Sequence, residues 1–106
     1  MKELESKIVN YLQNHSSSEK RIYSAQLEEE FKTSGIQVRN AIKGLRRAGE
    51  PIANSDSGYF YATTRADIAP TVSDLKRRAV SMLTTASALE RNFIELGEHQ
   101  TEIPFK

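Results

Sequence analysis

The segment SGIQVRNAIKGLRRAGEP, residues 34–51, constrains the fold most, because the signals for both ends of a helix occur in it. Ser34 is a residue type that caps helix N-termini, and Gly49 suits the left-handed position after a helix. Pro51 cannot continue a helix. We therefore expect a helix over about residues 35–47. At 100° per residue, its apolar side chains fall within a sector of about 100°. They are Val38, Ala41, Ile42 and Leu45.

Three shorter elements are expected before this helix. The apolar spacing predicts a helix over residues 2–14, and residues 21–23 fit a brief strand. Ser24 is then expected to cap a short helix over residues 25–32. The side chains expected to face inward from this short helix are Ala25, Leu27 and Phe31.

A β-hairpin is expected after residue 51. The segments 52–54 and 59–62 are strand-like, and the turn formers Ser55, Asp56, Ser57 and Gly58 separate them. Gly58 can take a positive φ in such a turn. The sequence therefore predicts a mainly α-helical fold with a small β-hairpin, followed by a further helix.

The net charge is only +1, but it is unevenly distributed. Residues 34–65 contain five basic and two acidic residues, whereas residues 1–33 and residues 66–106 each carry a net charge of −1. Exposed charges are screened beyond roughly 10 Å at 0.1 M salt, so a local positive region can attract a polyanion on a near-neutral chain. The expected helix 35–47 lies at the centre of this positive segment.

Helix 25–32, the turn KTS and helix 35–47 have the spacing of a helix-turn-helix, in which the second helix lies in the DNA major groove. Amide side chains can bind adenine edges, and basic ones can bind guanine or phosphate. A solvated polar face is the alternative interpretation. A glycine inside a helix, here Gly44, lowers helix stability by about 1 kcal/mol relative to Ala. Its presence is explained either by close approach of a partner or by simple tolerance. The polar sector contains Ile36, Gln37, Asn40, Lys43, Gly44 and Arg47, flanked by Arg39 and Arg46.

The stretch IYSAQLEEEFKTSGIQVRNAIKGLRRAGEPIANSDSGYFYA resembles the winged helix-turn-helix DNA-binding domain of the biotin-repressor N-terminal type, over roughly residues 4–62. The shared pattern is a Ser-capped short helix, a turn serine, an xVRxxIxxLRxxGxPI segment and a Gly-Tyr wing strand. The segments GYFYATTRADI and LKRRAVSMLTTASALE also resemble small winged-helix proteins encoded in prophages of Gram-positive bacteria. Nothing resembles the catalytic ligase portion of biotin repressors. The matching residues are Ser24, Leu27, Phe31, Ser34, Val38, Arg39, Ile42, Leu45, Arg46, Gly49, Pro51, Ile52, Gly58 and Tyr59.

The resemblance implies sequence-specific binding to double-stranded DNA, as a phage or prophage regulator of transcription or replication. In this resemblance the expected hairpin is the wing, with residues 55–58 at its tip. It contains an acidic residue and no basic one, which weakens it as a phosphate clamp. Tyr59 and Tyr61 can either hydrogen-bond phosphates or cover the core. The residues expected to contact DNA are Ser34, Gln37, Arg39, Asn40, Lys43, Arg46, Arg47, Ser57, Tyr59 and Arg65.

Residues 64–97 are expected to form one long helix. Thr64 and Asp67 form a plausible N-cap pair. Pro70 lies either in the first turn of a helix that begins near Ala69, or at a kink in one that begins at Arg65. Apolar or small residues recur at alternating spacings of four and three, the pattern of a coiled coil. The seam comprises Ile68, Val72, Leu75, Ala79, Met82, Ala86, Leu89, Phe93 and Leu96.

This helix is too long for a small domain to cover. A helix of 25–30 residues spans about 40 Å, so packing on its own domain accounts for only part of the seam. We expect the distal part to pair with a second copy in a homodimer, parallel or antiparallel. The expected organisation is a winged domain at residues 1–63, a dimerisation helix at 64–97 and a flexible tail at 98–106.

Several function classes are not expected. His15 and His99 are the only histidines and there is no cysteine, so we expect no metal site, and no enzyme motif occurs. No cofactor or small-molecule ligand is evident. There is no apolar run of membrane-spanning length and no signal-peptide pattern, so the expected location is the cytoplasm. The alternative to DNA binding is a protein–protein interaction module that binds a host or phage protein and has little DNA affinity.

Overall fold

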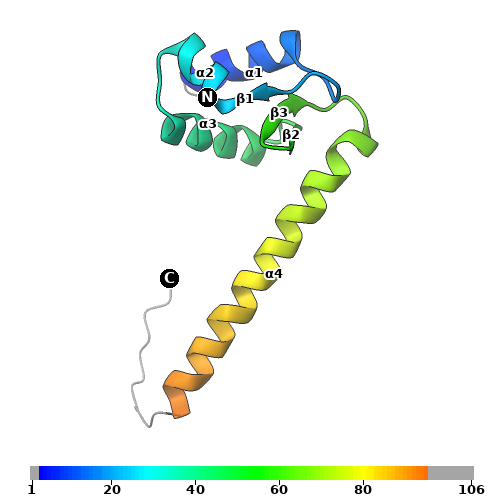
Figure 1. Ribbon diagram of the computed structural model, residues 1–106. Coiled ribbons are helices and arrows are strands. Elements are labelled where there is room, and N and C mark those ends of the chain that lie inside the picture. The colour runs from blue at the N-terminus through cyan, green and yellow to red at the C-terminus, as the bar shows by residue number, and fades with distance from the viewer. Residues whose placement is uncertain (1–2, 96–106) are drawn as a thin grey trace. The chain divides into compact units, whose positions relative to one another are not determined.

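The computed structural model describes residues 3–95, and their side chains as far as Phe93. Leu96 and the tail expected at residues 98–106 lie outside the described residues. The chain is mainly α-helical, with a small antiparallel sheet and a long C-terminal helix, as the sequence predicts (Figure 1). The elements are α1 (Glu3–His15), β1 (Ile22–Tyr23), α2 (Ser24–Phe31), α3 (Gly35–Arg47), β2 (Ile52–Ser55), β3 (Gly58–Tyr61) and α4 (Arg65–Glu95).

The chain divides into two compact units. The first unit ends at Val72 and the second begins at Ser73. Because α4 begins at Arg65, its first two turns belong to the first unit. The division therefore falls inside α4, whereas the sequence places it between residues 63 and 64.

The first unit is built around one main cluster of apolar side chains from α1, α2, α3 and the sheet. All four apolar residues predicted for the inner face of α3 are buried. Leu27 of α2 is also buried, and Phe31 is half-buried against the cluster. The prediction for Ala25 is wrong because it lies two residues, or about 200°, from Leu27 and is exposed. The cluster comprises Ile8, Val9, Leu12, Ile22, Leu27, Val38, Ala41, Ile42, Leu45 and Ile52.

The ends of α2 and α3 follow capping chemistry. The α3 prediction is confirmed, since the Gln37 backbone N–H donates to the Ser34 hydroxyl oxygen at 3.2 Å. Gly49 follows α3 with a φ of +96°, the conformation expected there. The prediction for α2 is wrong by one residue. Tyr23 is the N-cap, and its backbone N–H donates to the Gln26 side-chain oxygen at 2.8 Å.

The three strands form an antiparallel sheet in the order β1-β3-β2. The β2–β3 loop has two residues, Asp56 and Ser57, with φ values of +49° and +71°. Positive φ at both positions is the requirement of a type I′ hairpin. The expected turn role of Gly58 is wrong. Gly58 lies in β3, where a Cβ atom would stand 2.7 Å from the Cβ of Arg21, so glycine permits β1 to approach closely.

The start of α4 is fixed to the hairpin. The Asp67 backbone N–H donates to the Thr64 hydroxyl at 3.1 Å, which confirms the predicted N-cap pair. The helix begins at Arg65 and contains Pro70, so the alternative start near Ala69 is wrong. The backbone N–H of Asn54 in β2 donates to the hydroxyl of Thr71, which is buried, at 3.1 Å. Ile68 packs against a second apolar cluster, formed by Ala53, Phe60 and Ala62.

Candidate nucleic-acid interface

The outward face of α3 carries polar and basic side chains. Asn40, Lys43 and Arg47 follow at spacings of three and four, so they share one face of the helix, and all three are exposed. Ile36 lies on the same face with 63% of its surface exposed. The sequence placed Ile36 in this sector but did not assign it to the site. No acidic residue occurs in α3, so the face is uniformly neutral or positive.

Gln37 is also exposed, but its side-chain oxygen takes part in the cap of α3. This oxygen accepts hydrogen bonds from the Thr33 hydroxyl and from the Ser34 backbone N–H, the latter at 3.4 Å. Bidentate binding to adenine needs both the oxygen and the nitrogen of an amide side chain. Gln37 would have to give up these cap bonds to bind adenine in this way. Ser34 itself is exposed, but its hydroxyl serves the cap.

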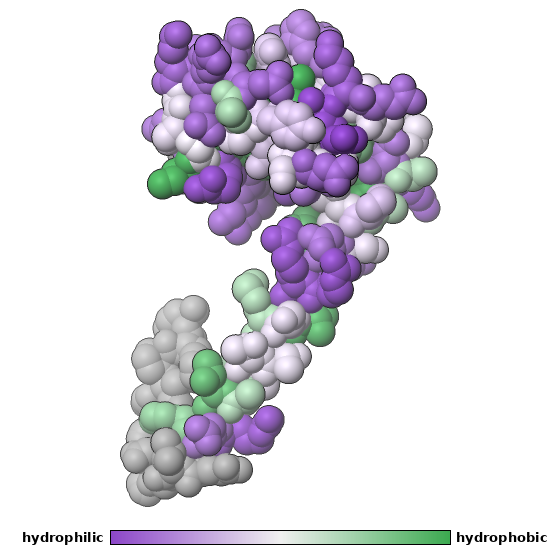
Figure 2. Space-filling view, viewed as in Figure 1, coloured by the Kyte–Doolittle hydropathy of each residue, from purple (hydrophilic) through white to green (hydrophobic). Residues whose placement is uncertain are grey.

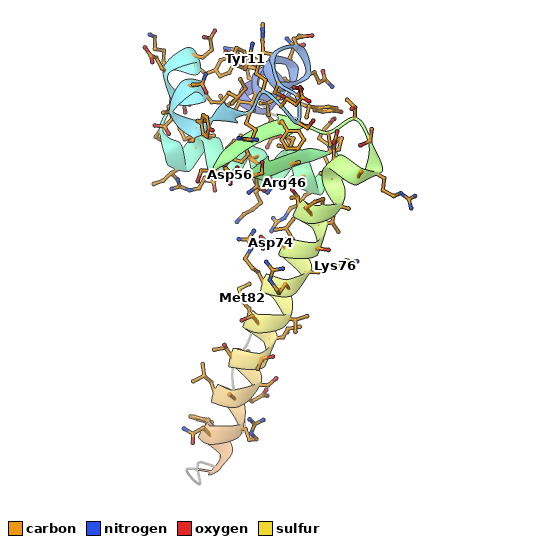
Figure 3. The ribbon with its side chains drawn as sticks, turned by 45° about the vertical axis from the view of Figure 1, so that its right-hand side comes forward. Tyr11, Arg46, Asp56, Asp74, Lys76 and Met82 are labelled. Carbon is orange, nitrogen blue, oxygen red and sulfur yellow. The ribbon has the colours of Figure 1, made fainter. Side chains whose placement is uncertain are left out.

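Arg46 lies on the side of α3 that faces the hairpin (Figure 3). Its Nε donates to the backbone oxygen of Ile52 at 2.8 Å, and its Nη2 donates to Oδ1 of Asn54 at 2.9 Å. Ile52 and Asn54 both belong to β2. The guanidinium of Arg46, expected to contact DNA, therefore joins α3 to β2 within the first unit.

Gly44 lies where α3 packs against α1. A Cβ atom on Gly44 would stand 3.1 Å from the Glu5 carboxyl carbon and closer still to one of its oxygens. The close approach for which glycine leaves room is therefore with α1 of the same chain. A shallow hollow beside it is lined by Leu4, Glu5, Gln37, Asn40 and Ala41. The polar sector of α3 is thus divided between a side next to α1 and a fully outward side.

Arg39 is exposed at the edge of the outward face, close to an acidic residue of α2. Its Nη1 atom and the Glu28 carboxylate both lie within 3.6 Å of the position that a Cβ on Gly35 would occupy. The negative charge of Glu28 partly offsets the positive charge of Arg39 there. Lys43 and Arg47 are therefore the stronger cationic positions on α3.

The structure brings a basic residue to the β2–β3 hairpin. Nη2 of Arg21, in the residue before β1, lies 3.7 Å from a carboxylate oxygen of Asp56 at the β2–β3 turn. The hairpin itself has no base, so sequence reasoning missed this pair. The pairing of β1 with β3 could have indicated it, since Tyr23 lies opposite Gly58. Arg21 offsets the one acidic charge of the hairpin, that of Asp56.

The remaining predicted contact residues, Ser57, Tyr59 and Arg65, lie in the hairpin and at the start of α4. Ser57 is exposed at the turn, and Arg65 is exposed at the first residue of α4. Tyr59 is half-buried and packs against the main core cluster. The hydroxyl of Tyr61 donates to a carboxylate oxygen of Glu50 at 2.8 Å, so it serves the fold.

Tyr61 also has a perturbed pKa. A hydrogen bond with Gln13 lowers the pKa of Tyr61, but the hydrogen bond to Glu50, burial and the charge of Glu50 together raise it above its ordinary value. The phenol therefore stays protonated and remains a donor to Glu50 in neutral solution.

The predicted seam of α4 is exposed along most of its length. Val72 and Leu75 are 41% and 40% exposed, and Met82 and Leu89 exceed 60%. Ala79 and Ala86 are exposed as well, and Phe93 is 38% exposed. Ile68 differs because it packs against the hairpin cluster of the first unit. Figure 2 shows apolar side chains (green) at the surface of the C-terminal half of α4.

Over residues 3–95, no helix combines the length and the apolar character needed to cross a membrane. Comparison of the chain with protein-family models, curated proteins and solved structures found no match.

Proposed function

We propose that the first unit is a winged helix-turn-helix domain that binds double-stranded DNA in a sequence-specific manner, with α3 in the major groove. The main support for this proposal is the outward face of α3, where Asn40, Lys43 and Arg47 are exposed together on a helix without acidic residues. The order α1-β1-α2-α3-β2-β3 supports this assignment. Such a domain would serve a phage or prophage regulator of transcription or replication, acting in the cytoplasm.

In this proposal, each exposed side chain of α3 makes a different contact with DNA. Asn40 binds an adenine edge, and Lys43 and Arg47 bind guanine or phosphate. Ile36 supplies apolar contact for a thymine methyl group. The residues outside α3 contribute contacts to the DNA backbone only. They are Arg65, Ser57 and the Arg21–Asp56 pair. Arg46 positions β2 relative to α3 through its two hydrogen bonds.

Salt-dependent binding to a duplex tests the proposal. Affinity for a mixed-sequence duplex, measured by fluorescence anisotropy, should fall linearly with the logarithm of salt concentration. Lys43→Ala and Arg47→Ala should each weaken binding and reduce the salt slope by about 1, as the loss of one phosphate contact requires. Arg91→Ala on α4 is the matched control, because it removes the same charge elsewhere. No measurable binding at about 50 mM salt would refute DNA recognition.

We further propose that α4 pairs two copies of the chain, which would match two-fold DNA half-sites. The exposed seam from Val72 to Phe93 supports self-association. A competing function is a protein–protein interaction module, which the net charge of +1 and the same exposed apolar residues favour. Duplex binding distinguishes this function from DNA recognition, and the molar mass by light scattering tests self-association. A species of 12.0 kDa, the mass of one chain, contradicts self-association.

A further inference from the structure

The seam of α4 has its small residues in only one of its two heptad positions. The first position is occupied by Ala79 and Ala86 in the middle of the seam, whereas the second is occupied by large side chains throughout. Every one of these residues is exposed. The relative direction of two paired helices therefore decides whether the alanines meet each other or meet large side chains. The large residues of the second position are Leu75, Met82 and Leu89.

An antiparallel pair fills the seam better than a parallel pair. In a parallel pair, each position faces the same position of its partner, so two layers would contain only alanine and would be poorly filled. In an antiparallel pair, the first position of one helix faces the second position of the other, which sets small against large side chains. A register centred on residue 84 sets each alanine against a large side chain and pairs two large side chains in the layer beyond them. The layers are then Ala79–Leu89, Met82–Ala86 and Leu75–Phe93.

The charges beside the seam favour the same direction. Lys76, Leu83 and Glu90 follow at spacings of seven along one edge of the seam, and all three are exposed. Lys76 extends from α4 in Figure 3. In the antiparallel register, Lys76 of each helix lies beside Glu90 of the other, and the two Leu83 side chains meet between these ion pairs. A parallel pair would instead place Lys76 and Glu90 beside threonines, at positions 71 and 85.

The area that such a pair buries approaches the size of the smallest stable interfaces. Full burial of a Val, Leu, Met or Phe side chain removes roughly 60–120 Å² from water. Six such side chains per helix contribute, so two helices bury at most on the order of 700–1,400 Å², and the upper end of this range passes the lower bound of about 1,200 Å² for stable interfaces. Leu83 adds to the seam here because it lies at the centre of the pair. The six are Val72, Leu75, Met82, Leu83, Leu89 and Phe93.

We infer that two copies of the chain pair through α4 as an antiparallel coiled coil centred on residue 84, held in register by two Lys76–Glu90 ion pairs. This inference rests on the proposed self-association through α4 and is independent of DNA binding. The described part of the second unit consists of α4 alone, so it has no other element with which to cover the seam. A second α4 supplies a seam of matching length and complementary charge.

Charge reversal in the full chain tests the register, with the dimer dissociation constant measured by analytical ultracentrifugation. Lys76→Glu should raise this constant about tenfold at low salt, because two attractive pairs become two repulsive ones. Glu90→Lys should act in the same way. The double variant, Lys76→Glu with Glu90→Lys, should restore the wild-type value. Arg91→Glu is the matched control on the opposite side of α4 and should leave the constant unchanged.

Disulfide crosslinking gives a second readout, because the chain contains no cysteine. A mixture of Ala79→Cys chains and Leu89→Cys chains should form the mixed disulfide on mild oxidation. Ala79→Cys alone should form little disulfide, since the antiparallel register holds its two copies far apart. Circular dichroism checks that each variant keeps its helices.

The outcomes separate the direction of pairing from pairing itself. Efficient crosslinking of Ala79→Cys alone, or a double charge reversal that fails to restore the dimer, overturns the antiparallel register and leaves self-association standing. A wild-type species of 12.0 kDa at high concentration overturns both. Duplex binding is measured separately, so the loss of either proposal is distinguishable from the loss of DNA recognition.

Discussion

Substitutions of Arg46 and Arg47 test whether the structural role and the proposed DNA-contact role of α3 belong to different arginines. The guanidinium of Arg46 donates to the Ile52 backbone oxygen at 2.8 Å and to Asn54 Oδ1 at 2.9 Å. Arg46→Ala removes both donors and leaves the backbone oxygen of Ile52, a fully buried residue, without this partner. Hydrogen bonds to charged groups contribute about 1.5–3 kcal/mol each. Because Asn54 is exposed and water can replace its partner, we expect a total loss near 2 kcal/mol.

Urea denaturation measures this loss. For a small protein with a slope of about 2 kcal/mol per molar urea, the midpoint should fall by about 1 M. Arg46→Lys keeps the charge but cannot reproduce the planar two-donor geometry, so it should also lose stability. Arg47→Ala removes an exposed arginine from the same helix turn, so its midpoint should stay close to the wild-type value.

Duplex binding completes the comparison. Arg47→Ala should weaken DNA binding, and Arg46→Lys should leave the salt slope unchanged under conditions where it is folded. The structural role of Arg46 is refuted if Arg46→Ala unfolds at the wild-type urea concentration and loses as much DNA affinity as Arg47→Ala. Arg46 would then be a contact residue, as the sequence pattern predicts.

Three further substitutions test the packing. Gly44→Ala should raise the free energy of unfolding by up to about 1 kcal/mol, because only a flexible carboxylate end must move; loss of DNA affinity would instead indicate a partner at this position. Gly58→Ala should lower the thermal midpoint, since its Cβ would stand 2.7 Å from the Cβ of Arg21; an unchanged midpoint contradicts the crowding. Thr71→Val removes the acceptor for the Asn54 backbone N–H and should cost about 1 kcal/mol in urea denaturation; a cost near zero would mean that this bond does not fasten α4.

The outward face of α3 could be predicted from the sequence because a helix with marked ends fixes the direction of every side chain. Asn40, Lys43 and Arg47 follow from the 3.6-residue period alone. The partners of Gln37 and Arg46 could not be predicted in the same way. A polar side chain at the edge of a helix face can turn to solvent, to a cap or to a neighbouring strand, and only the packed neighbour decides.

By itself, the sequence determined the element order, the capped helix α3, the buried stripe of α3 and the position of the apolar seam on α4, because these depend on local propensity and periodicity. Only the tertiary structure decided which neighbours the glycines, Arg21 and Ile68 contact. Gly58 is required by the approach of the chain at β1 and not by the turn, and Gly44 lies against the Glu5 side chain of α1. Arg21 lies beside the hairpin turn, and Ile68 packs against the hairpin and not along the seam, because residues distant in sequence meet there. The repeat of a helix or strand gives the direction of a side chain, whereas the partner of that side chain depends on contacts between elements.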